Sequence, residues 1–165
     1  MALTQRERCV AFTGHRSYNG EHNVSLRRTI IELYNEGYDT FLCGMAIGFD
    51  MIAAEVLLDL RKMLPHLRLI CVIPFEGQQE SFSPDKRERF NAIVAQADSV
   101  ITLQPKYSVG AYHGRNDYLV SNASVVVAYF TGESGGTAYT VKRAVKMGRR
   151  LINLHLNPQQ MFDFR

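Results

Sequence analysis

The chain has 165 residues, of which 46% are hydrophobic and 21% charged, and its formal net charge is +3. This composition is ordinary for a globular protein of one domain and excludes a disordered chain. A charge of +3 without a dense basic stripe does not by itself indicate nucleic-acid binding, and no run approaches the ~18 apolar residues that span a bilayer.

The N-terminus and the cysteines bear on the compartment. Met1 to Arg8 is polar and charged, so we expect no secretory signal. Cys9, Cys43 and Cys71 are odd in number, widely spaced and each set in an apolar run, which favours three buried thiols over a disulfide or a metal site. We therefore expect a cytoplasmic protein with no membrane contact and no bound metal.

Six short runs along the chain are continuously apolar instead of alternating with polar residues. Runs of this kind are typical of parallel strands that helices cover on both faces. In chain order, the predicted strands are Cys9–Thr13, Thr40–Cys43, Arg68–Ile73, Ser99–Leu103, Ser124–Tyr129 and Arg150–Leu154.

Amphipathic stretches separate these strands and predict helices. Their apolar stripes are Leu26, Ile30 and Leu33; Ala53, Val56, Leu57, Leu60 and Leu64; and Phe90, Ile93, Val94 and Ala97, followed by a shorter helix around Tyr118 and Leu119 and a last one from about Thr137 to Met147. Gly37 and Gly148 stand where helices are expected to end, and the third helix is expected to begin with Ser83 as its cap and Pro84 at its first position.

Six β–α units in a chain too short for an eight-stranded barrel predict an α/β fold: a doubly wound, mainly parallel Rossmann-like sheet of about six strands with helices on both faces. We expect one such domain over residues 1–156 and a C-terminal tail over 157–165. In sheets of this kind ligands bind outside the carboxyl ends of the strands, so unusual residues directly after a strand carry the most weight.

Thr13-Gly14-His15-Arg16 follows the first predicted strand. Gly14 lets the backbone turn tightly and approach a ligand, the Thr13 hydroxyl can donate, and the planar guanidinium of Arg16 suits a phosphate. The same residues are compatible with a plain turn whose arginine points into solvent.

The second predicted strand leads into Gly44-Met45-Ala46-Ile47-Gly48-Phe49-Asp50, with two glycines four apart before a helix. Unpaired backbone N–H groups and the helix dipole favour an anion at such a turn. The spacing is neither G-x-G-x-x-G nor a Walker sequence, so it predicts neither an ordinary dinucleotide fingerprint nor an ATPase. Asp50 is expected either to cap the helix or to contact the ligand.

A second glycine-rich turn, Thr131-Gly132-Glu133-Ser134-Gly135-Gly136-Thr137, follows the fifth predicted strand. Gly135 and Gly136 free the backbone, while Thr137 can cap the helix and hydrogen-bond an anion. The alternative is a flexible loop that only connects the strand to the helix.

The fourth predicted strand is followed by a long aromatic loop from Pro105 to Gly114, a candidate lid or partner surface. Arg115 and Asn116 come next, and we expect Arg115 to neutralise a phosphate and Asn116 to read a base or sugar edge. The chain has no G-x-S-x-G elbow and no His or Cys spacing typical of metal ligands, so neither nucleophilic catalysis nor a metal site is indicated.

Taken in order, Thr13–Arg16, Gly44–Asp50, Arg115-Asn116 and Gly135–Thr137 resemble the SLOG superfamily, named for its DNA-processing (Smf/DprA) and LOG branches, and specifically its small YpsA-like proteins. The resemblance covers nearly the whole chain. It implies a Rossmann-like sheet that binds nucleotides, nucleotide-derived signals or nucleic acid, and a homodimer or larger assembly. The expected ligand-binding residues are Thr13, Gly14, His15, Arg16, Gly44, Met45, Ala46, Gly48, Asp50, Arg115, Asn116, Thr131, Gly135, Gly136 and Thr137.

The two better-known branches imply different activities. The DNA-processing branch binds single-stranded DNA, and its glycine-rich turn and Arg-Asn element are similar to Gly44–Asp50 and Arg115-Asn116. This chain has no clear basic groove, which makes DNA binding the weaker inference. The LOG branch hydrolyses nucleoside monophosphates with the motif P-G-G-x-G-T-x-x-E, and here Thr140 takes the place of the catalytic glutamate.

The sequence therefore predicts a sensor or regulatory module that binds a nucleotide, NAD or an ADP-ribose-like ligand at the carboxyl ends of the strands, with no catalytic residue assigned. Three alternatives stay open: a nucleotide N-glycosidic hydrolase with Asp50 as its first candidate carboxylate, a single-stranded DNA binder, and an interaction protein whose pocket is vestigial.

Overall fold

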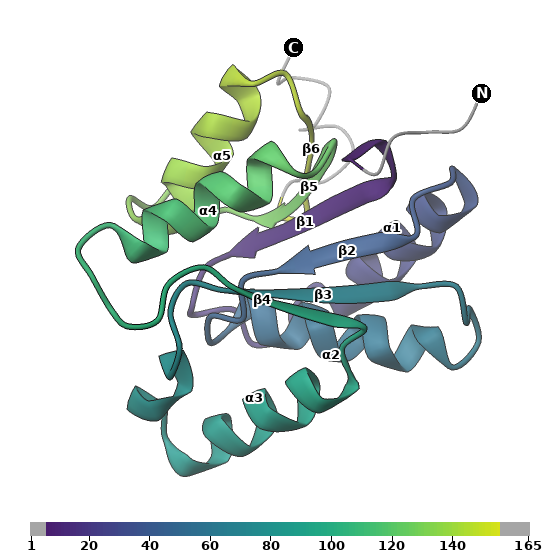
Figure 1. The fold of residues 1–165 in the computed structure, drawn as a ribbon. Coiled ribbons are helices and arrows are strands. Elements are labelled where there is room, and N and C mark those ends of the chain that lie inside the picture. The colour runs from purple at the N-terminus through teal and green to yellow at the C-terminus, as the bar shows by residue number, and fades with distance from the viewer. Residues whose placement is uncertain (1–5, 156–165) are drawn as a thin grey trace.

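The computed structural model describes residues 6–155, which form a six-stranded sheet. Helices lie on both faces of this sheet (Figure 1). The strands are β1 (Cys9–Gly14), β2 (Thr40–Cys43), β3 (Arg68–Ile73), β4 (Ser99–Thr102), β5 (Val125–Tyr129) and β6 (Arg150–Asn153). They lie in the order β4-β3-β2-β1-β5-β6, and all neighbouring pairs are parallel. This confirms the predicted Rossmann-like class, while the predicted tail over 157–165 lies outside the described residues.

Five helices cover the two faces of the sheet. The elements are α1 (Asn23–Asn35), α2 (Phe49–Arg61), α3 (Pro84–Gln96), α4 (Ala111–Ser121) and α5 (Gly136–Lys146), with short 3-10 turns η1 (Arg6–Arg8) and η2 (Gln78–Ser81). Helices α1, α2 and α3 pack against one face, and α4 and α5 pack against the other. No helix within residues 6–155 is long and apolar enough to cross a membrane.

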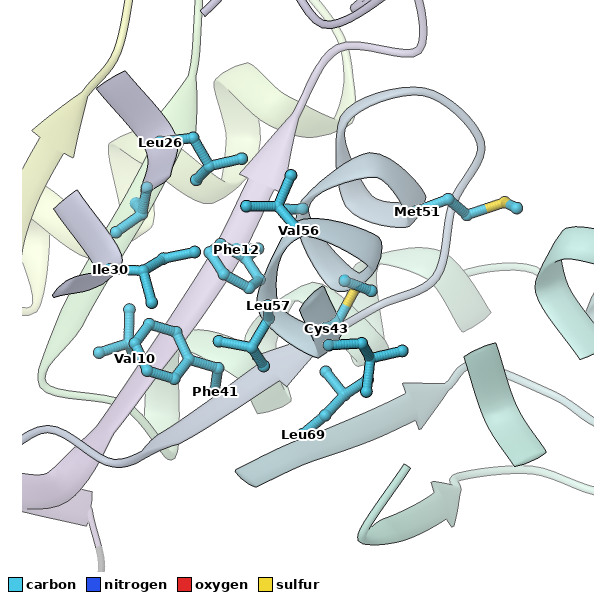
Figure 2. Close-up of a cluster of buried hydrophobic side chains, with 14 of the residues drawn as sticks. Val10, Phe12, Leu26, Ile30, Phe41, Cys43, Met51, Val56, Leu57 and Leu69 are labelled. Atoms are coloured by element: carbon cyan, nitrogen blue, oxygen red, sulfur yellow. The ribbon is translucent and has the colours of Figure 1, made fainter. Parts of the chain in front are cut away.

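The larger core lies between the sheet and helices α1 and α2. Phe12 of β1 stacks on Phe41 of β2 at 5.5 Å between ring centroids and meets Phe49 of α2 edge-on at 6.2 Å. Figure 2 shows Leu26 and Ile30 of α1 reaching the same cluster. Each such buried side chain contributes roughly 1.5–3 kcal/mol to folding, which is why the continuously apolar runs become the central strands.

The three cysteines are buried thiols, as predicted, and none forms a disulfide among residues 6–155. Burial raises the pKa of Cys71 to about 12, so this thiol stays protonated. Gly37 follows α1 with a φ of +106°, also as predicted.

One prediction at a helix start is confirmed and another is wrong. Ser83 is the N-cap residue of α3 and Pro84 its first residue, as predicted, although the Ser83 side chain makes no capping hydrogen bond to the described residues. The loop predicted as Pro105 to Gly114 ends earlier, because α4 already begins at Ala111. Arg115 and Asn116 lie on the buried face of α4, where they interrupt the apolar stripe that would have revealed the helix.

The strand order reverses at β1. The chain moves outward from β1 through β2 and β3 to β4, then returns to place β5 on the other side of β1. The segments that leave the carboxyl ends of β1 and β5 therefore diverge to opposite faces, and a crevice opens between them.

Candidate functional site

A cleft of about 600 Å³ lies at this reversal, between the carboxyl ends of β1 and β5 and the first turns of α4 and α5. All the predicted ligand residues line it except Gly44, Met45, Gly48 and Thr131. Five further residues line it that the sequence did not single out as ligand residues: Ser17, Tyr112, His113, Glu133 and Ser134. In the sequence, Tyr112 and His113 are marked only by their position just before Arg115. That position indicates a place at the cleft only once α4 is known to begin there.

The N-terminus of α5 opens onto the cleft. Gly135 is the residue before the helix, with a φ of +132°, and none of the described side chains caps the helix there. The expected capping role of Thr137 is therefore wrong, because the two glycines let the helix begin before it. Thr137 instead lies in the first turn, buried and lining the cleft. The first N–H groups of α5 have no acceptor within the helix, the arrangement that phosphate-binding helices use.

Arg115 and Asn116 bring two further donors to this point. Arg115 Nε donates to Asn116 Oδ1 at 2.8 Å, and its Nη1 donates to the Gly44 carbonyl. Because Oδ1 is thus engaged, the Asn116 amide group faces α5, where a Cβ on Gly136 would lie 3.6 Å from Nδ2. The structure records no acceptor for Asn116 Nδ2 or Arg115 Nη2 among residues 6–155, although the two residues are only 8% and 4% exposed.

Asp50 places a buried carboxylate in the wall of the same cleft. It is 5% exposed, and its Oδ2 accepts from the Ala46 N–H at 3.2 Å. Burial raises the pKa of Asp50 to about 6, against the lowering effects of the Arg115 guanidinium and the Ala46 N–H. The carboxyl group therefore changes charge near pH 6.

The turn Gly44–Gly48 is packed against its neighbours and contributes only Ala46 to the cleft wall. A Cβ on Gly44 would lie 2.7 Å from Arg115 Nη1, and one on Gly48 would lie 2.4 Å from the Arg16 carbonyl oxygen. Gln78 Nε2 donates to the carbonyls of Gly44 and Met45 at 3.4 and 3.3 Å. These glycines allow close contact between loops, instead of exposing N–H groups to a ligand.

His15 ties the first turn to the β5–α5 loop. Its Nε2 accepts from the Thr131 N–H at 3.0 Å, and the Glu133 carboxylate lies 4.0 Å from the same nitrogen. Thr131 thus contacts His15 through its backbone N–H but does not itself line the cleft. Burial lowers the pKa of His15, an effect that Glu133 partly offsets.

The sequence profile described as the YspA SLOG family (YpsA) matches residues 22–157, most of the chain. The chain belongs to the YpsA family of SLOG proteins. Among curated relatives, a UPF0398 protein of Brevibacillus brevis is 29% identical over 115 residues. That alignment covers 68% of this chain and 61% of the relative.

Two solved structures of DNA processing protein A share the fold. The one from Streptococcus pneumoniae aligns over 89% of this chain and 50% of its own, with a TM-score of 0.62 and 19% identity. The Helicobacter pylori protein, whose structure concerns single-stranded DNA binding, aligns over 87% of this chain and 63% of its own, with a TM-score of 0.62 and 21% identity. These likenesses confirm the Rossmann-like architecture, and this chain spans only part of each protein.

This YpsA-family chain differs from the LOG arrangement at Thr140. The side chain is almost fully buried, and its hydroxyl donates to the Gly136 carbonyl at 2.8 Å inside α5. It does not line the cleft. The position that carries the glutamate in the LOG motif therefore presents no group to a bound ligand here. Within the described part of the chain, no three His, Cys, Asp or Glu side chains are placed to hold a metal ion.

Proposed function

We propose that this chain binds a nucleotide or a nucleotide-derived, phosphate-bearing ligand in the β1/β5 cleft, as a sensor or regulatory module. The observation that carries the proposal is the convergence of Arg115, Asn116 and Thr137 at the N-terminus of α5. All three are more than nine-tenths buried, and all three line the cleft. Buried donors are normally paired, so polar side chains that keep a free donor toward a cleft indicate a ligand that accepts from them.

The interaction energies expected at this site favour the binding of an anion. A hydrogen bond to a charged group contributes about 1.5–3 kcal/mol, and a helix N-terminus adds about 0.3–1 kcal/mol. Arg115 is held to Asn116 and to the Gly44 carbonyl, so little side-chain freedom is lost when a ligand binds. Arg16 is exposed at the cleft, where it can close over a phosphate. A volume of about 600 Å³ is in the range typical of small-molecule sites and accommodates more than a phosphate alone.

The test is a calorimetric and thermal-shift panel of AMP, ADP, ATP, NAD and ADP-ribose. At least one of these ligands is expected to bind. Thr137→Val keeps the shape of the side chain and removes its hydroxyl, so it should weaken the affinity for that ligand about tenfold, or by about 1.4 kcal/mol. Thr102→Val on the exposed end of β4 is the matched control and should leave affinity unchanged. Equal affinity in both variants, or no binding across the panel, would overturn the assignment.

Single-stranded DNA is the second candidate ligand. Both DNA processing protein A structures share the fold, and the solvent-exposed ring of Tyr112 lies at the cleft with the Arg115 guanidinium 5.7 Å from its centroid. Exposed aromatic rings beside cationic groups stack bases. Binding of an oligonucleotide that weakens steeply with salt, without any response to mononucleotides, would favour this function.

The absence of enzymatic turnover and the oligomeric state of the chain stay predictions. The buried position of Thr140 disfavours the LOG reaction, and we expect no base release from the nucleotide panel. A homodimer and a cytoplasmic location are expected, the first to be checked by light scattering of the purified chain.

A further inference from the structure

The contact between His15 and the β5–α5 loop requires a neutral imidazole. Because the Thr131 N–H donates to His15 Nε2 at 3.0 Å, that nitrogen carries a lone pair and the ring proton lies on Nδ1. The His15 side chain is only 10% exposed, while the Thr131 end of this hydrogen bond is open to solvent. A proton on Nε2 would set two N–H donors against each other, and the contact would break.

A carboxylate acceptor also lies within reach of the same nitrogen. Glu133 Oε2 is 4.0 Å from His15 Nε2, and Glu133 is two residues after Thr131 on the same loop. The Glu133 side chain is 70% exposed and has room to approach. The loop therefore has two arrangements available, one with neutral His15 bonded to an amide and one with charged His15 bonded to a carboxylate.

The remaining charges around His15 set where it titrates. Burial lowers the pKa of His15 below its ordinary 6.5, Glu133 raises it, and His155 beyond β6 lowers it. The charged and titratable groups that face it are Tyr129 on β5, Glu133 on the β5–α5 loop, His155 after β6, His22 against the Tyr129 ring, and Arg16, Asp50, His113 and Arg115 around the cleft.

We propose that protonation of His15 moves its Nε2 contact from the Thr131 amide to the Glu133 carboxylate, and that this pair sets how much negative charge the cleft accepts. The inference rests on the proposed anion site, since Glu133 lines the same cleft as the N-terminus of α5. With His15 neutral, the Glu133 charge opposes an incoming phosphate. With His15 charged, that repulsion is offset, so anion affinity increases on acidification. By linkage, a bound anion raises the proton affinity of His15 by the same factor.

The first test needs no ligand. Nitrogen-15 NMR of the full chain between about pH 5 and pH 8 follows the His15 ring nitrogens and the Thr131 amide together. At the alkaline end Nε2 is expected to be unprotonated, and the Thr131 amide resonance is expected to shift with the same midpoint as the His15 ring. In Glu133→Gln the His15 midpoint should move to lower pH. A Thr131 amide that is insensitive to the titration of His15 would overturn the switch.

The second test measures binding of ADP-ribose, whose phosphate oxygens stay ionised across this range. Affinity for the wild-type chain is expected to rise about three- to tenfold from pH 8 to pH 5.5. His15→Gln should lose part of this rise, and the lost part is the contribution of His15, because Asp50 is present in both proteins. His66→Gln, an exposed histidine just before β3, should keep the full rise. An identical rise in His15→Gln contradicts the proposal.

The two tests separate the switch from the site. If ADP-ribose does not bind at any pH while Thr131 follows His15, the proposed ligand is wrong and the switch stands. If ADP-ribose binds with no His15-dependent change, the site stands and the role of the His15–Glu133 pair is refuted.

Discussion

The two glycine-rich turns that precede α2 and α5 are similar in sequence, but the first is tightly packed and the second is open. In the β2–α2 turn, a Cβ on Gly44 or Gly48 would lie 2.7 Å or less from Arg115 or from the Arg16 backbone. In the β5–α5 turn, a Cβ on Gly135 would meet nothing within 4 Å in the described part of the chain. In the first turn the glycines allow neighbouring segments to pack closely, and in the second Gly135 leaves open space.

The two turns therefore have different roles at the site. The packed turn holds Arg115 through the Gly44 carbonyl, and Arg115 in turn orients Asn116 toward the open turn. Glycine at the start of a helix therefore does not by itself identify a phosphate site; the atoms around the missing Cβ decide its role. Substitutions in and around the two turns separate the two roles.

Gly48→Ala should strongly destabilise the fold. The residue has a φ of +86°, and its Cβ would lie 2.4 Å from the Arg16 carbonyl oxygen, a backbone atom that cannot rotate away. Backbone strain and overpacking together predict a loss of about 3 kcal/mol or more in the free energy of unfolding, measured in urea. Gly37→Ala is the control, since its φ is also positive but its Cβ would meet no described atom, and it should lose only about 1 kcal/mol. Equal losses would show that strain alone, and not packing, governs the β2–α2 turn.

Asp50→Asn should change how stability depends on pH. The folded pKa of Asp50 is raised from 3.8 to about 6, so between these values the folded state binds the proton that the unfolded state releases. The resulting stabilisation is complete below about 3.8 and is lost as pH rises through about 6. From pH 4.5 to pH 8, the stability of wild type relative to the variant should fall by about 2 kcal/mol in urea titrations.

Glu88→Gln, an exposed carboxylate on α3, provides the control for Asp50 and should show a constant difference from wild type. A constant difference for Asp50→Asn as well would mean that the carboxyl group is not desolvated in the first turn of α2.

The sheet and the position of the cleft at its carboxyl end could be predicted because both follow from local patterns. Continuous apolar runs identify buried parallel strands, and the residues after each run lie at one edge of the sheet. The roles of the two turns could not be predicted, because they depend on contacts between segments that are distant in the sequence. Arg115 and Gly44, for example, are 71 residues apart. The same contact hid the start of α4, since a buried arginine reads as a surface residue until its acceptor is known.

Gly136→Ala should separate binding from stability in the open turn. The new methyl group would touch only Asn116 Nδ2 among the described atoms, at 3.6 Å, and the position is the first of a helix. Stability should stay within about 0.5 kcal/mol of wild type. Affinity for the ligand identified in the nucleotide panel should fall about tenfold, because the methyl group covers the donors of α5 and Asn116. A variant that binds normally would place the ligand elsewhere in the cleft.

Gly114→Ala should have the smallest effect, and it tests whether a third glycine belongs to either role. Gly114 lies within α4, its φ is not positive, and its Cβ would meet no described atom within 4 Å. Neither packing nor strain requires glycine there, so alanine should raise the free energy of unfolding by about 0.5–1 kcal/mol through helix propensity. Ligand affinity should not change, since Gly114 does not line the cleft although His113 and Arg115 do. Weaker binding with unimpaired stability would show that the ligand extends over the surface of α4, and Gly114 would then share the role of Gly136 in leaving room for it.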